Sequence, residues 1–186
     1  MTSGIELVPL RCSNCSCTMA GAQGNVFLYC QSCSYGYEIT LEDTWNPVKV
    51  YFAKTQQEAN TFFAFWAYDA KLDLKSRESK KGFFSSASKG LSDIFQQRGT
   101  IRFYVPAFYE ELDSKQSRAL DLTYRQPDLE YLPAQKQLPQ VAIAERDARK
   151  IADDIFLTSE IEQKDTLRSL VYLLHLDNPF LIAIAF

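Results

Sequence analysis

Cys12-Ser13-Asn14-Cys15 and, after fourteen intervening residues, Cys30-Gln31-Ser32-Cys33 form the stretch on which the fold of this chain depends. Two Cys-x-x-Cys pairs at this separation are typical of a metal site, because each pair brings two sulfur atoms to one side of an ion. Four thiolates complete the tetrahedron that zinc prefers. The sequence therefore predicts a bound zinc ion. A site closed by four protein ligands leaves no open position for a substrate, so we expect the ion to be structural.

The residues around the two pairs favour small β-hairpins. Residues 21–25 supply a turn, and residues 26–29 supply a strand that leads into the second pair. Apolar and polar residues then alternate over 35–40, as they do in a strand. Residues 10–41 thus resemble a zinc ribbon, a family of small four-cysteine β-modules. The resemblance implies that the zinc ligands are Cys12, Cys15, Cys30 and Cys33.

The first pair departs from the ribbon pattern. Ribbon modules usually carry a glycine after the second cysteine of a pair, whereas this chain has Ser16 there, followed by a fifth cysteine, Cys17. Cys17 could replace Cys15 as a ligand, although the symmetric pairing is preferred. With the symmetric pairing, we expect Cys17 to be a small side chain that packs beside the site. Disulfides or free thiols are the alternative to a metal site.

The length and composition suit one small module and one larger domain. We expect a zinc ribbon at 1–44 and an α+β domain at 45–186, because 186 residues with 46% hydrophobic character can form a sizeable core. All five cysteines lie in the metal motif, which favours a reducing, cytoplasmic location. We expect neither a signal peptide nor a transmembrane helix. Serine at Cys12 or Cys30 should then unfold the ribbon and leave the larger domain folded.

Alternating residues predict the strands of the larger domain. Residues 48–52 and 61–75 are expected to be strands, although Ala59, Phe62, Phe63 and Trp66 would also fit one face of a helix. The second of these strands should pair antiparallel with 100–105. Residues 167–176 and 180–186 are expected to form a hairpin around the turn Asp177-Asn178-Pro179.

Helical spacing indicates two helices in the same domain. Apolar residues recur at this spacing over 108–124, where Pro127 should end the helix, and again over 148–156. Residues 141–144 are expected to form a short strand. The predicted fold class is α+β: a zinc ribbon followed by a mainly antiparallel sheet with about two helices on one face.

A basic segment separates two of the predicted strands. Residues 71–102 contain eight basic and three acidic residues, although the whole chain carries a net charge of −3. Within them, the basic loop at 76–99 is long for a connection in a compact domain. Its apolar residues fit a short amphipathic helix that could bind a protein partner or an anionic membrane surface, or could cover the domain's own core. The residues expected to contact a partner are Lys80, Lys81, Phe83, Phe84, Lys89, Leu91, Phe95 and Arg98.

The sequence contains no set of residues typical of catalysis. His175 is the only histidine and lies in an apolar strand, so we expect it to be packed or at a strand edge. Asp153 and Asp154 are adjacent on a helix and point in different directions. We therefore expect a non-enzymatic binding or scaffold protein that engages a protein partner, or a membrane surface, through residues 76–99.

Nucleic-acid binding through the basic segment 71–102 is the alternative function. It would be supported if Arg11, Lys49 and Lys54 shared a face with that segment, and if Tyr29, Tyr35 or Tyr37 stacked on bases. The ribbon itself carries few lysines or arginines, which weakens this hypothesis because phosphate contacts dominate such binding.

A longer resemblance rests on two short motifs. Phe-Ala-Phe-Trp at 63–66 and Phe-Tyr-Val-Pro-Ala-Phe at 103–108 follow the cysteine module. With that module, they resemble uncharacterised bacterial zinc-ribbon proteins. The resemblance implies a bacterial source and supplies no activity.

Overall fold

Seven strands and three helices make up the part of the chain that the computed structural model describes, which is residues 10–21, 24–39, 47–55, 61–79, 90–109, 112–132, 137–163 and 167–186. The strands are β1 (Phe27–Tyr29), β2 (Tyr35–Glu38), β3 (Pro47–Lys54), β4 (Phe62–Ser79), β5 (Thr100–Pro106), β6 (Glu130–Leu132) and β7 (Leu167–Ala185). The helices are α1 (Leu91–Arg98), α2 (Leu112–Arg125) and α3 (Glu145–Gln163).

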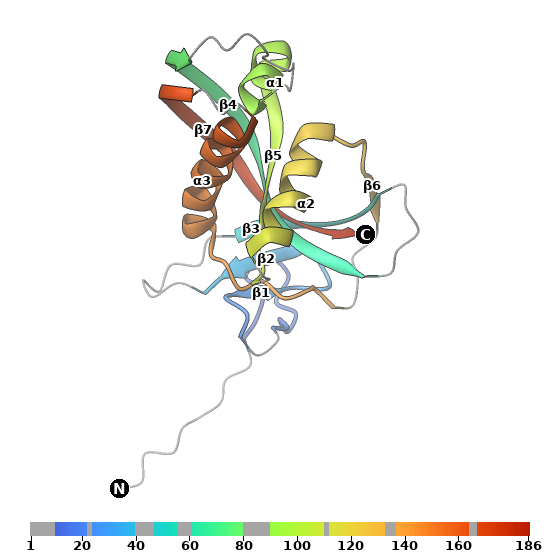
Figure 1. The fold of residues 1–186 in the computed structure, drawn as a ribbon. Coiled ribbons are helices and arrows are strands. Elements are labelled where there is room, and N and C mark those ends of the chain that lie inside the picture. The colour runs from blue at the N-terminus through green and yellow to red at the C-terminus, as the bar shows by residue number, and fades with distance from the viewer. Residues whose placement is uncertain are drawn as a thin grey trace, which may run out of the picture.

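The strands form one sheet in the order β1-β2-β3-β7-β4-β5, with β6 paired to the side of β3 (Figure 1). Every strand pair is antiparallel except that of β3 with β7. The predicted α+β class with a mainly antiparallel sheet is therefore confirmed.

Two long strands, β4 and β7, form the centre of the sheet. They contain 18 and 19 residues and pair antiparallel from Phe62↔Ala185 to Ser79↔Leu167. The predicted strand at 61–75 is thus confirmed, and the helical alternative for residues 62–66 is wrong. The predicted pairing with 100–105 is also confirmed, since Phe65↔Pro106 to Lys71↔Thr100 join β4 to β5.

The hairpin predicted around residues 177–179 is wrong, because β7 continues through them. Its register against β4 changes from Ala67↔Phe180 to Asp69↔Asp177, which leaves one extra residue in β7 and identifies a β-bulge. Asn178 has a φ of 49°, and its side-chain N–H donates to Asp69 Oδ2 at 2.9 Å. Asparagine with positive φ and proline without an N–H suit a bulge as well as a turn, which explains the error.

Two helices cover a face of the sheet, and the third lies along its edge. Helices α1 and α3 pack on one face, whereas α2 lies beside β5 (Figure 1). Side chains of α2 and of the residue that follows it bond the outer backbone of β5: Thr123 Oγ1 accepts the Tyr104 N–H at 3.1 Å, and Gln126 Oε1 accepts the Arg102 N–H at 2.7 Å. These bonds cover an edge that would otherwise offer unpaired backbone groups. The helix predicted at 108–124 is confirmed by α2, and the one predicted at 148–156 by the longer α3.

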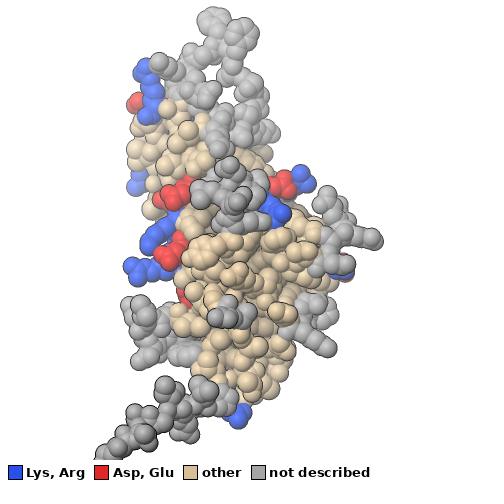
Figure 2. All heavy atoms as spheres, turned by 60° about the horizontal axis from the view of Figure 1, so that its bottom comes forward, with Lys and Arg blue, Asp and Glu red and all other residues tan. Residues whose placement is uncertain are grey.

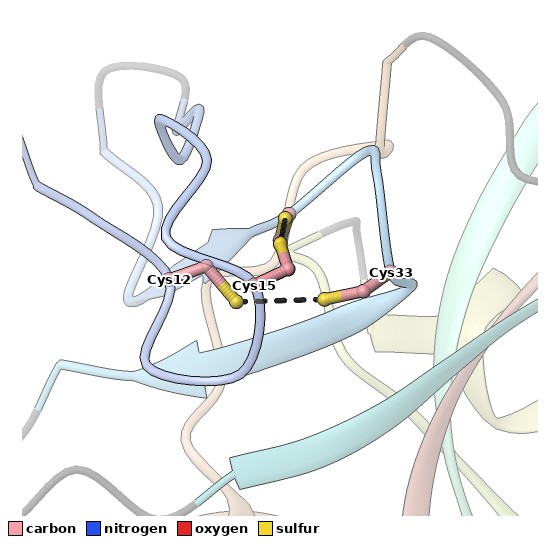
Figure 3. Close-up of side chains that lie close together, drawn as sticks. Cys12, Cys15 and Cys33 are labelled. Carbon is pink, nitrogen blue, oxygen red and sulfur yellow. Dashed lines mark hydrogen bonds between the residues drawn. The ribbon is translucent and has the colours of Figure 1, made fainter.

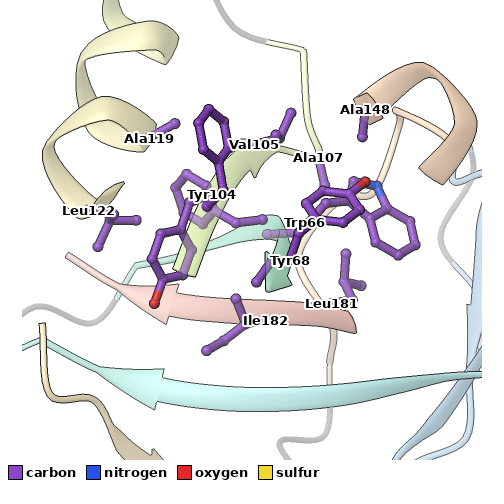
Figure 4. Packing of buried hydrophobic residues seen from close by; sticks show 14 of the residues in the cluster. Trp66, Tyr68, Tyr104, Val105, Ala107, Ala119, Leu122, Ala148, Leu181 and Ile182 are labelled. Atoms are coloured by element: carbon purple, nitrogen blue, oxygen red, sulfur yellow. The ribbon is translucent and has the colours of Figure 1, made fainter. Parts of the chain in front are cut away.

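The core lies on both sides of the central strands. Trp66 points toward Ala148 of α3, whereas Tyr104 lies between Leu122 of α2 and Ile182 (Figure 4). The short strand predicted at 141–144 is wrong, since these residues form an irregular segment. That segment still closes the core, because Trp66 Nε1–H donates to the carbonyl of Ile143 at 2.8 Å.

The cysteine module continues directly into the larger sheet. Strand β2 pairs with β3 from Tyr35↔Lys49 to Tyr37↔Pro47. The Phe27 ring meets Trp66 edge-on, with ring centroids 5.9 Å apart. Glu38 Oε1 accepts the backbone N–H of Glu145 at 3.0 Å, at the start of α3. The predicted boundary between residues 44 and 45 lies outside the described residues, but the sheet and the core extend across it.

Substituting Gly36 by alanine is expected to destabilise the protein by about 1–3 kcal/mol, because a Cβ atom would overlap the buried ring of Phe27. Gly21→Ala is the matched control, since the only close approach of its Cβ, at 2.7 Å, would be to the flexible end of the Leu28 side chain. Chemical unfolding of the two variants measures the difference. Equal stabilities would show that the ring of Phe27 moves aside freely.

Candidate metal centre

The two Cys-x-x-Cys pairs adopt the same backbone conformation. After the second cysteine of each pair the chain turns through a serine with positive φ, 60° at Ser16 and 58° at Ser34. The N–H of each serine donates to the carbonyl of the pair's first cysteine, at 2.8 Å in the first pair and 3.0 Å in the second. These serines occupy the position where ribbon modules usually have glycine, so the departure noted in the sequence does not change the turn.

The turns bring four sulfur atoms together. The Sγ atoms of Cys12, Cys15, Cys30 and Cys33 all lie within 4.8 Å of one another. The Sγ atoms of Cys12 and Cys33 are 3.4 Å apart (Figure 3). Those of Cys15 and Cys30 are also 3.4 Å apart. A tetrahedron with metal–sulfur bonds of about 2.3 Å has edges of about 3.8 Å, so the cluster fits a single ion.

The sulfur cluster contains Cys15 and does not contain the fifth cysteine, Cys17. Cys17 is exposed. The symmetric set of four cysteines is the one that the structure brings together. The structure therefore confirms that Cys12, Cys15, Cys30 and Cys33 form a group that could hold a metal ion.

Hydrogen bonds lower the pKa of the Cys12 thiol and so favour the thiolate that binds metal. Burial raises the pKa of the Cys12 thiol, but hydrogen bonds from the Tyr37 hydroxyl and from the N–H groups of Cys15 and Asn14 outweigh it, and the pKa falls to about 6. Ser13 Oγ lies 2.8 Å from the same Tyr37 hydroxyl and holds it in place. The thiolate, which is the form that binds metal, is thus favoured at neutral pH.

At Cys15 the neighbouring sulfur atoms raise the pKa of the thiol, in contrast to Cys12. The N–H of Cys17 lowers the pKa of Cys15, but the neighbouring Cys30 thiol and burial raise it well above its usual value. Four sulfurs this close cannot all ionise without a compensating charge. A divalent cation between them supplies that charge, which is the physical reason that such a cluster suits a metal.

The cysteine module has almost no charge on its surface. In residues 10–21 and 24–39 the charged side chains are Arg11 and Glu38, and this end of the molecule shows a nearly uncharged surface in Figure 2. Tyr29 and Tyr37 are buried, so these two rings do not offer the stacking surface that would have supported nucleic-acid binding. Tyr35 is half-buried and keeps part of its ring exposed.

The residues predicted to contact a partner fall into three groups. Leu91 and Phe95 are buried and pack in the domain's own core, so they offer no exposed surface. Arg98 is exposed at the end of α1. Lys80, Lys81, Phe83, Phe84 and Lys89 lie outside the described residues, and their role stays a prediction.

A buried carboxylate that the sequence did not single out anchors the start of α1. Glu160 of α3 is fully buried and accepts hydrogen bonds from the N–H and the hydroxyl of Ser92, both at 2.9 Å. Arg77 of β4 forms an ion pair with it at 3.1 Å. The available signal was its spacing, because Glu160 continues the apolar face of α3 that begins at Ala148 and Ala152. The network joins Arg77 of β4 and the start of α1 to α3.

No protein-family model, curated protein or solved structure matches this chain. The resemblance to a zinc ribbon therefore rests on the four cysteines, and the resemblance to bacterial zinc-ribbon proteins stays a prediction. None of the helices in the described part of the chain has the length and apolar character needed to cross a bilayer.

Proposed function

We propose that this protein is a non-enzymatic binding protein whose folded state is maintained by one structural zinc ion. The observation that carries the proposal is the closed group of four sulfurs, with every pair of Sγ atoms within 4.8 Å. Soft thiolate ligands in a tetrahedral arrangement select zinc over harder cations such as magnesium or calcium. Four protein ligands leave no coordination position for a substrate or a reactive water, which supports a structural role.

The binding role is assigned to the 76–99 segment, with a protein as the partner. Arg77 and Ser92, which stand on either side of residues 80–89 in the sequence, both bond to Glu160. Residues 80–89 include Lys80, Lys81 and Lys89 together with Phe83 and Phe84, a combination that suits an acidic, partly apolar surface. An anionic membrane surface is the other candidate that this chemistry suits.

The zinc is tested by native mass spectrometry of the purified chain. We expect one zinc ion per chain, retained by Cys17→Ser and lost by Cys15→Ser, because only the second variant removes a sulfur from the cluster. Retention by both variants, or a different metal in the wild-type chain, would contradict the proposed site.

The binding segment is tested by replacing residues 80–89 with a glycine-serine linker of equal length. This variant keeps Leu91, Phe95 and the Glu160 network, so it should fold normally. Crosslinked partners should disappear in the variant, and vesicles that contain phosphatidylserine should show whether a membrane is bound instead. An unchanged set of crosslinked partners and no vesicle binding would exclude the segment as the contact.

A further inference from the structure

A hollow of about 760 Å³ lies on the face of the sheet opposite α3. Tyr68 points toward α3, since its hydroxyl donates to the carbonyl of Glu145 at 3.4 Å. Successive residues of a strand point to opposite faces, so Asp69 points away from α3 and into the hollow. Six of the lining residues bear on what the hollow could bind: Tyr35, Lys49, Tyr51, Arg102, Tyr131 and Phe180.

Aromatic rings form a large part of the hollow. Tyr51 contacts both Tyr131 and Phe180 edge-on, with ring centroids 5.3 Å apart in each case. Tyr131 is 55% exposed, and Tyr35, Tyr51 and Phe180 are only partly buried. The open face of an antiparallel sheet usually carries polar side chains. A group of exposed rings in a concave site therefore indicates a ligand with a flat, apolar surface.

Two cations accompany the rings. The guanidinium of Arg102 lies 4.6 Å from the centroid of Phe180 and is fixed by an ion pair with Asp69 at 3.0 Å. Lys49 is exposed on β3, and none of the ion pairs between described residues includes it. The hollow thus presents one fixed and one unpaired positive group beside its rings, which suits a ligand that also carries negative charge.

We propose that this hollow binds single-stranded nucleic acid, with bases stacked on Tyr131 and its neighbours and phosphates held by Lys49 and Arg102. A single strand offers an exposed flat base next to each phosphate, whereas a duplex hides its bases in the stack. A neutral sugar would need free hydrogen-bond acceptors. The carboxylate in the hollow, Asp69, is already bound to Arg102 and to Asn178.

The neighbouring charges limit the length of strand that can be held. Lys71 is exposed on the same face, two residues beyond Asp69 in β4, and can take one more phosphate. Asp177 lies opposite Asp69 across the β4–β7 pair, and Asp73 lies four residues beyond Asp69 in β4; both are exposed and would repel the next phosphate. The site therefore accommodates a short run of nucleotides, and its affinity should depend on salt.

Fluorescence anisotropy with labelled oligouridine of about twelve nucleotides, at about 50 mM salt, tests the proposal. The wild-type chain should bind, and Tyr131→Ala should weaken binding about tenfold because one stacking platform is lost. Lys49→Ala should weaken binding and reduce the slope of log K against log salt by about 0.7, the value for one lost phosphate contact with a single strand. Both residues are exposed, so neither substitution should disturb the fold.

Matched controls separate this hollow from other contacts. Tyr109→Ala removes an exposed tyrosine outside the hollow, and Lys150→Ala removes an exposed lysine of α3 on the other face. Both should bind as the wild type does, and so should the variant with residues 80–89 replaced. The proposal is overturned if oligouridine does not bind, if a duplex of equal length binds as tightly, or if Tyr131→Ala and Lys49→Ala bind like the controls.

Discussion

Serine in place of Cys30 is expected to abolish zinc binding and to destabilise the entire chain. Structural zinc contributes about 10–16 kcal/mol in small peptides, as much as the whole stability of a typical domain. The sequence alone predicts that only the ribbon would unfold and that the larger domain would stay folded. The structure changes that expectation, because β2 is paired with β3 and the Phe27 ring packs on Trp66. Unfolding the cysteine module therefore exposes one side of the main core.

The fluorescence of Trp66, recorded in a Trp45→Phe background because the chain has two tryptophans, and the near-ultraviolet circular dichroism measure this effect. Trp66 is fully buried and contacts the module directly, so its emission should shift to longer wavelength in Cys30→Ser and after chelation of the zinc. Cys17→Ser is the control and should keep both signals. A Cys30→Ser variant that lacks zinc but retains the wild-type melting temperature would show that the larger domain folds independently, as the division at residue 44 predicts.

Alanine in place of Glu160 is expected to cost about 3–5 kcal/mol, because it leaves the partly buried Arg77 without its ion-pair partner and removes the acceptor for two bonds from Ser92. The matched control on the same helix is Asp147→Ala. It breaks the exposed pair with Lys150, and such pairs contribute under about 1 kcal/mol. Urea unfolding of both variants gives the comparison.

A double substitution distinguishes the pair from its surroundings. Removing both charges with Arg77→Met and Glu160→Leu should recover part of the loss, because apolar pairs often replace buried ion pairs without penalty. Helix α1 should also become more accessible to proteases in Glu160→Ala, since it loses its anchor. If Glu160→Ala and Asp147→Ala cost the same, the network does not stabilise the fold.

The metal site was predictable because its information is local. Cys-x-x-Cys spacing places two sulfurs within a single turn, and the structure adds only that Ser16 and Ser34 adopt the positive φ expected of glycine. Strand β4 was likewise predictable from alternation, since residues 69–75 change face at every step. In both cases neighbouring residues determine the result.

The features that sequence analysis missed depend on distant partners. Residues 177–179 contain turn-forming types, and only the presence of β4 alongside makes them a bulge. Glu160 and Ser92 are 68 residues apart, so no local pattern joins them. Side chains from six strands line the hollow. Alternation along each strand predicts only which face of the sheet a ring lies on, and it does not show that these rings come together.

The position of β7 in the sheet has a consequence for the order of folding. This strand comes last in the chain, yet it lies between β3 and β4 and pairs with both. At a synthesis rate of about 5–20 residues per second, the roughly 110 residues between β3 and β7 take on the order of ten seconds to make. During that time β4 can pair with β5, but its other edge and the inner edge of β3 have no partner. Such non-local pairing slows folding, so a newly made chain spends this period with apolar strand edges that need protection from other chains.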